Sequence, residues 1–348
     1  LMPLPHRPLE GVTVLCLGGI GPIPFAGMLL ADFGARVIRV SRPGPETWEF
    51  SHHILWRDQE RLEADFKDPQ DLQKITDMLR DVDVVLEGFR PGVAERLGLG
   101  PAEAREANPA IIYGRMTGWG QTGPLAAAAG HDINYIALSG ALEPITADDS
   151  MPVPPLNLLG DFAGGSLYLV SGVLAALLQA QHTGQGTVID AAIVDGAAHL
   201  TAMLHSMRER GAWSDARGTN LLDGGAPFYR IYKTADEKYI SVGAIEPKFY
   251  AALLDTLGLT EELAGVEQND EQAWPGVQQR FAEIFATRSR DEWVDAFSLV
   301  DACVAPVIAP HEVLDEPHLK ARRSYADVDG QIHPTTAPRF SPLPTSTE

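Results

Sequence analysis

Residues 11–40 read GVTVLCLGGIGPIPFAGMLLADFGARVIRV, and this stretch decides the fold. The apolar run at 11–17 is typical of a buried strand, and a glycine-rich turn follows it. Residues 25–34 have the pattern of a helix that ends at a glycine, and 35–40 form a second apolar run. Strand, helix and strand in this order make a βαβ unit. We therefore expect an α/β fold, with a Rossmann-like large domain built on an open parallel sheet.

The alternation of strands and helices continues along the chain and then changes character. Strands are predicted at 83–86, 110–115 and 186–190, and helices at 71–79 and 162–181. Beyond 224, the pattern predicts a hairpin (228–232 and 239–242), amphipathic helices at 247–257 and 291–297, and a strand at 305–308. A chain of 348 residues is too long for one small core. We predict a large α/β domain over 1–224, to which 311–348 return, and a smaller α+β domain over 225–310.

The charge balance excludes several classes of partner. The formal net charge is −20, so nucleic acid and an anionic membrane surface would be repelled. The most apolar run, 167–180, is interrupted by Ser171 and Gly172 and is too short to span a bilayer. No signal-peptide pattern is present, and we expect a cytoplasmic location. Positive charges that suit a small polyanionic ligand nevertheless gather near the N-terminus: Arg36, Arg39, Arg42, Arg57, Arg61, Lys67, Arg90 and Arg96.

The chain has two cysteines, Cys16 and Cys303, which lie far apart in the sequence. One disulfide between them is possible, but we expect two reduced core residues, as is usual for a cytosolic protein. No cysteine or histidine spacing typical of zinc occurs, so no metal site is predicted.

The glycine turn after the first strand is only loosely similar to a dinucleotide-binding fingerprint. That fingerprint needs an acidic residue at the end of the second strand, in addition to glycines such as Gly19, Gly21 and Gly27. Here the second strand ends in the sequence RVSR, at 39–42. This cationic end suits a phosphate-bearing ribose, as in NADP or coenzyme A. An NADP-dependent dehydrogenase is disfavoured but stays open on charge alone.

Asp161 precedes the long apolar helix. Its position alone favours a helix N-cap, worth about 0.5–2 kcal/mol. The same position would also place a carboxylate beside free backbone N–H groups, where an anion is stabilised. Gly164 and Gly165 in the first turn would let a ligand approach that backbone closely. The residues alone leave a structural and a chemical role open.

His131 and Glu246 are polar residues in unusual settings. His131 lies between Gly130 and Asp132 at the start of a predicted helix, which Asp132 could cap. A single histidine is more often a surface or core residue than a catalytic one. Glu246 interrupts an apolar loop, and the following proline favours an extended backbone. A partly buried glutamate usually has a cationic partner, and His131 is a candidate.

These residues belong to longer motifs that resemble the α-methylacyl-CoA racemases, a branch of the class III CoA-transferase superfamily. The motifs are AGHDINYIALSG (129–140), PPLNLLGDFAGG (154–165), VGAIEPKFY (242–250), NLLDGGAPFY (220–229), GRMTGWGQTGP (114–124) and DACVAPV (301–307). The similarity covers nearly the whole chain. It implies an interlocked homodimer, with each active site between the large domain of one subunit and the small domain of the other.

The resemblance also implies roles for individual residues. His131 and Asp161 would be the two acid/base groups, and Glu246 would hydrogen-bond to His131 and tune it. The coenzyme A part of the substrate would lie along Arg42, Ala64, Asp65, Phe66, Lys67, Arg96, Gly130, His131, Asp132, Ile133, Asn134 and Tyr135. The enzyme would interconvert (2R)- and (2S)-2-methylacyl-CoA by moving the α-proton through a thioester enolate.

The residue types fit this chemistry. Two bases on opposite faces of the α-carbon are required, one protonated and one free. Backbone N–H groups at the start of the helix after Asp161 would stabilise the enolate oxygen. Because the thioester acidifies the carbon, no metal or organic cofactor is needed.

Two alternatives compete with the racemase. A class III CoA-transferase would use Asp161 as a nucleophile. Transferases typically carry an aromatic residue where this chain has His131 in GHD, and Glu246 in IEPKFY also favours the racemase. A CoA-binding protein without catalysis is disfavoured because all three chemical residues are present.

The chain departs from the family pattern near the predicted CoA site. LWRDQERLEADFK (55–67) stands where a basic loop of the type NRGKRS is usual, and Ser41 replaces an aspartate before Arg42. Met203 and Met207 are candidates for an adaptable acyl-binding surface, although helix packing is the commoner explanation.

Overall fold

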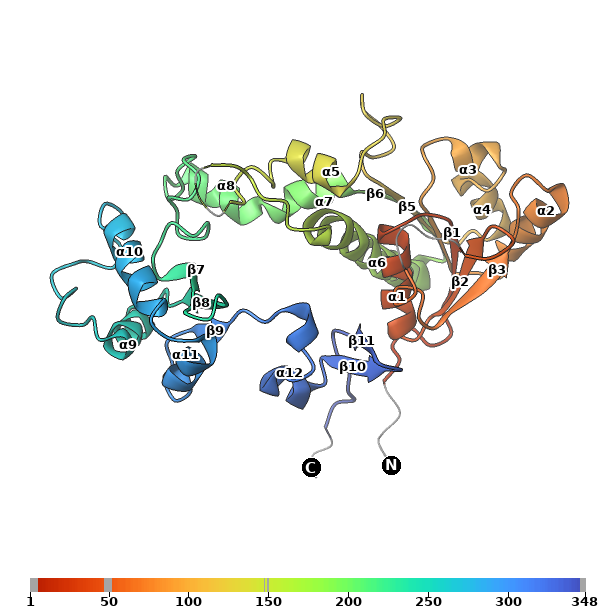
Figure 1. Ribbon diagram of the computed structural model, residues 1–348. Coiled ribbons are helices and arrows are strands. Elements are labelled where there is room, and N and C mark those ends of the chain that lie inside the picture. Colours follow the sequence, from red (N-terminus) through yellow and green to blue (C-terminus); the bar gives the residue numbers. More distant parts are fainter. Residues whose placement is uncertain (1–5, 47–51, 147, 149, 345–348) are drawn as a thin grey trace. The chain divides into compact units, whose positions relative to one another are not determined.

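The computed structural model describes residues 6–46, 52–146, 148 and 150–344 (Figure 1). It has two compact units: unit 1 comprises 1–141, 155–202 and 333–348, and unit 2 comprises 142–154 and 203–332. The chain therefore passes between units at other points than the predicted 224 and 311. Ion pairs explain the difference. Arg217 pairs with Glu143, and Arg290 with Glu312, so the segments around 217 and 312 are both fixed within unit 2.

Unit 1 is built on a six-stranded sheet in the order β3-β2-β1-β4-β5-β6, and every neighbouring pair is parallel. The strands are β1 Thr13–Leu17, β2 Arg36–Ser41, β3 Gln59–Glu63, β4 Val84–Glu87, β5 Ile112–Thr117 and β6 Thr187–Ala192. The predicted Rossmann-like parallel sheet is thus confirmed. The strand order reverses between β1 and β4, and ligands of such sheets bind at the carboxyl edge beside that point.

The sequence does not predict β3. Its residues, QERLE, contain only Leu62 as an apolar side chain. β3 pairs with β2 alone and forms one edge of the sheet. An edge strand buries less surface than a central one, so its sequence carries no apolar run for pattern analysis to detect.

Helices cover both faces of the sheet, and β1 shows the alternation. Val14 and Cys16 pack with α1 (Pro22–Asp32) and α6 (Leu167–Thr183), whereas Leu15 and Leu17 pack with α2 (Pro69–Met78) and α4 (Pro101–Ala107). Burial raises the pKa of the Cys16 thiol to about 12. Cys16 and Cys303 are both free thiols, as predicted, but Cys303 is exposed and not in a core.

The apolar helix begins earlier than predicted. A π-helical segment, η1 (Leu158–Ser166), continues into α6, and together they make a helix of 26 residues with a mean hydropathy of 1.6 in its most apolar window. Its length and composition would allow it to cross a membrane, unlike the shorter run considered in the sequence. Core helices of globular proteins meet the same criterion, and α6 buries one face (Leu169, Val170, Val173 and Ala176). The remaining helices of unit 1 are α3 (Val93–Arg96), α5 (Asp132–Ser139) and α7 (Ile193–Leu200).

Unit 2 is an α+β unit around a three-stranded antiparallel sheet. Its strands are β7 Tyr229–Lys233, β8 Tyr239–Gly243 and β9 Val304–Pro306. A separate hairpin is formed by β10 Tyr325–Val328 and β11 Gln331–Pro334, and the division between the units falls within β11, after Ile332. The helices are α8 Ala202–Glu209, α9 Pro247–Leu257, α10 Trp274–Phe285, α11 Arg290–Phe297, η2 Pro310–Glu312 and α12 Pro317–Arg322. Helix α10 is not predicted, although Trp274, Val277, Phe281 and Phe285 are its buried face, because Pro275 and Gly276 near its start weaken the helical pattern.

A buried ion pair connects β4 and β5 at the carboxyl edge. The Nε atom of Arg115 lies 2.8 Å from Oε1 of Glu87, and its Nη1 lies 2.6 Å from Glu95. Glu87 is only 1% exposed and also accepts the backbone N–H of Phe89. The pair therefore fixes the loop after β4, which lines the pockets described below.

Replacing Arg115 by methionine should lower the free energy of unfolding by about 3–5 kcal/mol, because the Glu87 charge would remain buried without its partner. Urea titration measures this difference. Arg105→Met, in exposed α4 surface, is the matched control and should change stability by less than about 0.5 kcal/mol. Equal stabilities for the two variants would show that the pair does not hold this edge.

Candidate active site

A pocket of about 910 Å³ opens at the carboxyl edge of unit 1, beside the reversal of strand order. We call it the central pocket. His131 and Asp161 both line it, with apolar side chains that include Leu156, Phe162 and Ile193. The two predicted acid/base residues, 30 positions apart in sequence, thus face one cavity.

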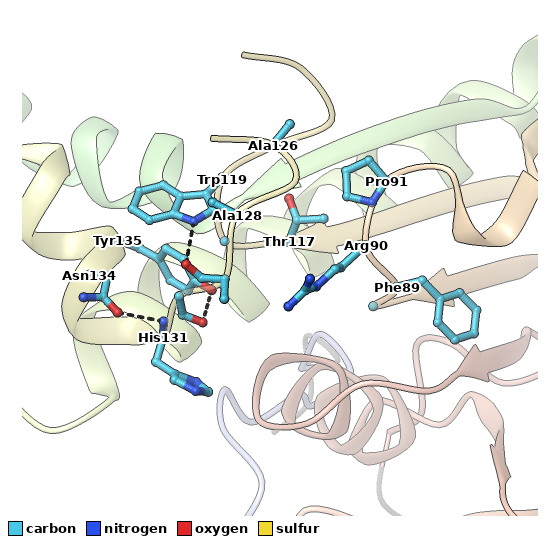
Figure 2. Close-up of a pocket in the computed structure, with 14 residues that line it drawn as sticks. Phe89, Arg90, Pro91, Thr117, Trp119, Ala126, Ala128, His131, Asn134 and Tyr135 are labelled. Carbon is cyan, nitrogen blue, oxygen red and sulfur yellow. Dashed lines mark hydrogen bonds between the residues drawn. The ribbon is translucent and has the colours of Figure 1, made fainter. Parts of the chain in front are cut away.

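His131 is held by the start of α5. It is the N-cap residue of α5, with an extended backbone (φ −134°, ψ 177°), so the suggestion that Asp132 caps this helix is wrong. Its backbone N–H donates to Oδ1 of Asn134 at 3.1 Å, and the Tyr135 hydroxyl donates to the carbonyl of Gly130 just before it. Figure 2 shows these contacts and the His131 ring extending from the backbone that they fix. The exposed imidazole is free to meet a ligand, while its backbone is anchored.

Asp161 lies within η1, so the prediction that it is a helix N-cap is wrong. The helical segment starts one turn earlier, with Asn157 as its N-cap. The Asn157 amide donates to Oδ2 of Asp161 at 3.4 Å. π-Helical turns are rare and frequently occur at functional sites. The carboxylate is half-buried in the first turn instead of preceding the helix.

Asp132 links the two bases. It follows His131 directly, and its Oδ2 accepts the backbone N–H of Asp161 at 2.6 Å. The N–H of Asp161 is therefore not available to an enolate, and the role expected for the N–H groups that follow Asp161 stays a prediction. Within the described residues the N–H of Asp132 itself, in the first turn of α5, has no acceptor.

The pKa of Asp161 is raised to about 6. Burial is the main cause, and the negative charge of Asp132 adds to it; the Asn157 hydrogen bond and His131 act in the opposite direction. A carboxyl group with this pKa can accept or donate a proton near neutral pH, as general acid–base catalysis requires.

Asp132→Asn should move the acidic limb of the pH profile to lower pH. The substitution removes a negative charge that raises the pKa of Asp161, so Asp161 should lose its proton at lower pH in the variant. Measuring kcat/KM against pH reports the pKa values of the catalytic groups in the free enzyme. Asp81→Asn, at an exposed turn remote from the pocket, should leave the limb in place. An unshifted limb in Asp132→Asn would show that Asp132 does not tune Asp161.

Two glycines lie close to the Asp161 segment for different reasons. Gly21, with a φ of 65°, stands against the carboxylate: a Cβ built on it would lie 3.2 Å from Oδ2 of Asp161. Gly164 instead packs on α7, where a Cβ would lie 2.9 Å from the N atom of Ala197. The prediction that Gly164 and Gly165 open the backbone to a ligand is therefore wrong, since Gly165 faces Ile193 in the same interface.

Two further pockets lie at the same edge of the sheet. The side pocket, about 500 Å³, shares Arg90, Gly130, His131 and Tyr135 with the central pocket (Figure 2). The arginine pocket, about 610 Å³, includes Arg39, Arg42, Arg61 and Phe66. It shares Gly19, Ile20, Ile23 and Gly88 with the central pocket. The three cavities therefore share walls along one edge, which suits an elongated ligand.

Half of the clustered N-terminal cations are neutralised by carboxylates. The pairs are Arg36–Glu60, Arg39–Glu46, Arg57–Asp32 and Arg61 with Glu46 and Glu63. Among the described residues, no carboxylate pairs with Arg42, Lys67, Arg90 or Arg96. These four cations remain for a polyanionic ligand.

The predicted CoA contacts lie after β2 and β3, at the end of α3 and around the start of α5. Ala64 follows β3 and donates its N–H to the carbonyl of Ser41, which places it beside Arg42. Phe66 and Arg42 line the arginine pocket, and Gly130, His131, Asn134 and Tyr135 line the side pocket. Ala64, Asp65, Lys67, Arg96 and Ile133 line none of the three pockets. Asp132 lines the central pocket, but its carboxylate binds η1.

Glu246 belongs to unit 2. Its backbone is extended (φ −73°, ψ 142°), as Pro247 predicts, and it is the N-cap residue of α9. The side chain is exposed, which contradicts the expected partial burial. The predicted hydrogen bond to His131 stays a prediction. Met203, also in unit 2, is 65% exposed, so its side chain does not serve the helix packing that was the commoner explanation for a methionine there.

His52 and Arg90 line the central pocket but are not among the predicted site residues. Arg90 follows β4 at the carboxyl edge, a position that the predicted strand could have indicated. His52 has no such signal, because it lies in a segment without strand or helix pattern. Within the described residues, no group of three His, Cys, Asp or Glu side chains is placed to hold a metal ion.

The parallel sheet, the α+β unit and the His–Asp pocket define a class of CoA enzyme, and comparison with known proteins agrees. The chain belongs to CoA-transferase family III, whose model matches residues 9–348. It is 45% identical to α-methylacyl-CoA racemase of Mus musculus and 44% identical to that of Homo sapiens, over 96% of this chain and 86% of each relative. Succinyl-CoA–D-citramalate CoA-transferase of Chloroflexus aurantiacus is 32% identical over 98% of this chain and 89% of its own.

Solved structures confirm the fold. A CaiB/BaiF family protein from Brucella suis has a TM-score of 0.81 at 24% identity, covering 97% of this chain and 93% of its own. A hypothetical protein from Mycobacterium tuberculosis has a TM-score of 0.80 at 27% identity, covering 97% and 94%. The fold is therefore that of the class III CoA-transferases.

Proposed function

We propose that this chain works as an α-methylacyl-CoA racemase, an isomerase that interconverts (2R)- and (2S)-2-methylacyl-CoA thioesters. The observation that carries the proposal is the meeting of His131 and Asp161 at one pocket. The similarity to two racemases over 96% of the chain supports it. Two different proton-transfer groups at one cavity are what inversion of a carbon acid needs.

In the proposed reaction one base takes the α-proton and the other returns one to the opposite face. Removal of the proton leaves the electron pair delocalised onto the thioester oxygen, as an enolate. The unpaired N–H of Asp132 is the donor best placed for that oxygen, since it adjoins His131. Reprotonation of the α-carbon by the second base completes the inversion. The acidity comes from the thioester, so the proposed chemistry requires no metal or organic cofactor.

The CoA part of the substrate is proposed to bind along the carboxyl edge, with its phosphates near the unpaired cations. Arg42 lies at the arginine pocket, and Arg90 lines the central and side pockets. The carboxylates of Glu46, Glu60 and Glu63 neutralise the neighbouring arginines. Binding should therefore depend on a few cations and not on the whole cluster.

Arg42→Gln should weaken CoA binding about tenfold, while Arg36→Gln should not change it. A hydrogen bond to a charged group is worth about 1.5–3 kcal/mol, and each 1.4 kcal/mol is about tenfold in affinity. Arg36, at the start of β2, is the same type of residue but is already paired with Glu60. Calorimetric titration with CoA measures the affinity of each variant. Equal effects would show that phosphate binding does not distinguish paired from unpaired arginines.

We also propose that the functional form is a homodimer. The α6 residues Leu167, Leu174 and Leu178 form an apolar stripe opposite its buried face, and they are 44%, 36% and 58% exposed. Ile133 and Leu138 of α5 are also exposed. A second copy of the chain would cover such a surface. Sedimentation at micromolar concentration should give twice the mass of 37.6 kDa, and a monomer would contradict the proposal.

A CoA-transferase would use the same pocket differently, with Asp161 attacking the thioester carbonyl and expelling CoA. The test is to incubate a single epimer of 2-methylacyl-CoA with the enzyme, with and without a free carboxylic acid. The racemase proposal predicts a mixture of epimers without the acid, and no transfer of CoA to a labelled acid. Turnover that requires the acid would support the transferase instead.

A further inference from the structure

We propose that His52 is a positioning residue that holds the glycine turn before α1 against Asp161. It would thereby set the position of the Asp161 carboxylate relative to the α-carbon of the substrate. This inference rests on the proposed racemase function. His52 is 6% exposed and lines the central pocket. Its Nε2 accepts the backbone N–H of Gly21 at 3.1 Å. Because a backbone N–H can only donate, Nε2 carries no proton and the ring proton is on Nδ1.

Gly21 transmits this contact to the carboxylate. It is the N-cap of α1 and stands so close to Asp161 that a Cβ would lie 3.2 Å from Oδ2. The hydrogen bond that the Gly21 N–H donates to His52 therefore fixes the backbone against which the carboxylate lies. Movement of Gly21 would change the position of the base relative to the substrate α-carbon.

Other contacts fix the same wall but not the Gly21 N–H. The Ser166 hydroxyl lies within hydrogen-bond distance of the carbonyls of Pro22 (2.7 Å) and Asp161 (3.1 Å), and Phe25 stacks on Phe162 with centroids 4.5 Å apart. These contacts join α1 and η1 beyond the turn. His52 supplies the one side-chain acceptor that Gly21 has among the described residues.

The His52 ring is itself held in place. It stacks on Trp56 with centroids 5.7 Å apart, and the Arg39 guanidinium lies 4.1 Å from the Trp56 ring centroid. The other charged or titratable side chains of the central pocket are Arg90, His131, Asp132, Tyr135 and Asp161. Protonation of Nε2 would set two donors, Nε2–H and the Gly21 N–H, against each other. The contact therefore exists only with neutral His52.

The inference predicts an effect on one of the two faces of the substrate. One epimer gives its α-proton to Asp161 and the other gives it to His131. When the Asp161 step is slowed, an enolate formed from the first epimer returns less often to its starting configuration. An enolate formed from the second epimer returns to its starting configuration more often, because its inversion requires the slowed proton transfer from Asp161. A general loss of structure would slow all steps and leave this partition unchanged.

The test compares His52→Phe, His52→Gln and the neighbouring His53→Phe with the wild type, using each epimer of a 2-methylacyl-CoA in D₂O. We measure the deuterium in recovered substrate relative to that in inverted product, and Asp161→Asn identifies the epimer that uses Asp161. His52→Phe should lower kcat about 10- to 100-fold, since a displacement of about 1 Å can cost about 10² in rate. The deuterium ratio should move in opposite directions for the two epimers. His52→Gln keeps an acceptor near the position of Nε2, so its kcat and its deuterium ratio should be close to those of the wild type. His53→Phe should match the wild type in both quantities.

An unchanged deuterium ratio in a folded His52→Phe variant would overturn the inference, as would equal impairment in His52→Gln. If circular dichroism shows that His52→Phe is unfolded, His52→Asn replaces it, because the shorter amide does not reach Gly21. Failure of the wild type to racemise would refute the proposed function, whereas a racemising wild type with an insensitive His52 refutes this inference alone.

Discussion

His131→Ala should lower racemisation by about 10³-fold while CoA affinity stays within about threefold of the wild type. The imidazole is exposed at the central pocket, and general acid–base groups contribute about 10²–10⁴ in rate. The backbone contacts of His131 with Asn134 do not involve its side chain, so the start of α5 should persist in the variant. Chiral separation of the acyl products measures the rate, and calorimetry measures CoA binding.

The variant should retain half of the chemistry. Asp161 can still remove and return a proton on its own face, so one epimer should exchange its α-proton with D₂O and keep its configuration. The other epimer should not exchange. Racemisation at the wild-type rate in His131→Ala would remove His131 from the mechanism.

Asp161→Asn should lower the rate of racemisation by at least as much as His131→Ala does. The epimer that still exchanges its α-proton with D₂O should be the other one. The amide cannot act as a base, yet it can occupy the same volume and accept the Asn157 hydrogen bond. Exchange without inversion should now occur only with the epimer that His131 deprotonates. The pKa of Asp161, raised to about 6 by burial and by Asp132, also predicts that wild-type activity falls as pH drops below this value.

Asn157→Ala is the matched control for Asp161→Asn. It removes a hydrogen bond that lowers the pKa of Asp161 but leaves the carboxylate in place, so activity should persist. Exchange with both epimers in Asp161→Asn would mean that another group serves as the second base.

The large features of the fold were predictable because they follow from side-chain periodicity. The βαβ pattern of residues 11–40 carries apolar runs and a helix-ending glycine, and β1, α1 and β2 lie there. β3 was not predictable, since QERLE at a sheet edge has no apolar run. The passage of 203–224 and 311–332 into unit 2 depends on pairs such as Arg290–Glu312, which join distant parts of the sequence.

The sequence motifs pointed to His131 and Asp161 together, but the contacts that support these two residues were not predictable. His131 and Asp161 stand in motifs that resemble a known family, and the structure places both at one pocket. The π-helical form of 158–166 and the hydrogen bond from the Asp161 N–H to Asp132 have no sequence pattern. The same holds for His52, whose contact with Gly21 spans 31 positions. Such contacts follow from tertiary packing and not from local propensity.

The central claim is that two bases at one pocket invert the carbon next to the thioester. Its most direct test is to incubate a single epimer of 2-methylacyl-CoA with the wild-type enzyme in D₂O, without any free acid, and to analyse both epimers by mass spectrometry after chiral separation. The two-base account predicts that both epimers form and that the inverted product carries one deuterium at the α-carbon. Inverted product without deuterium, or no inversion until a carboxylic acid is added, would contradict it.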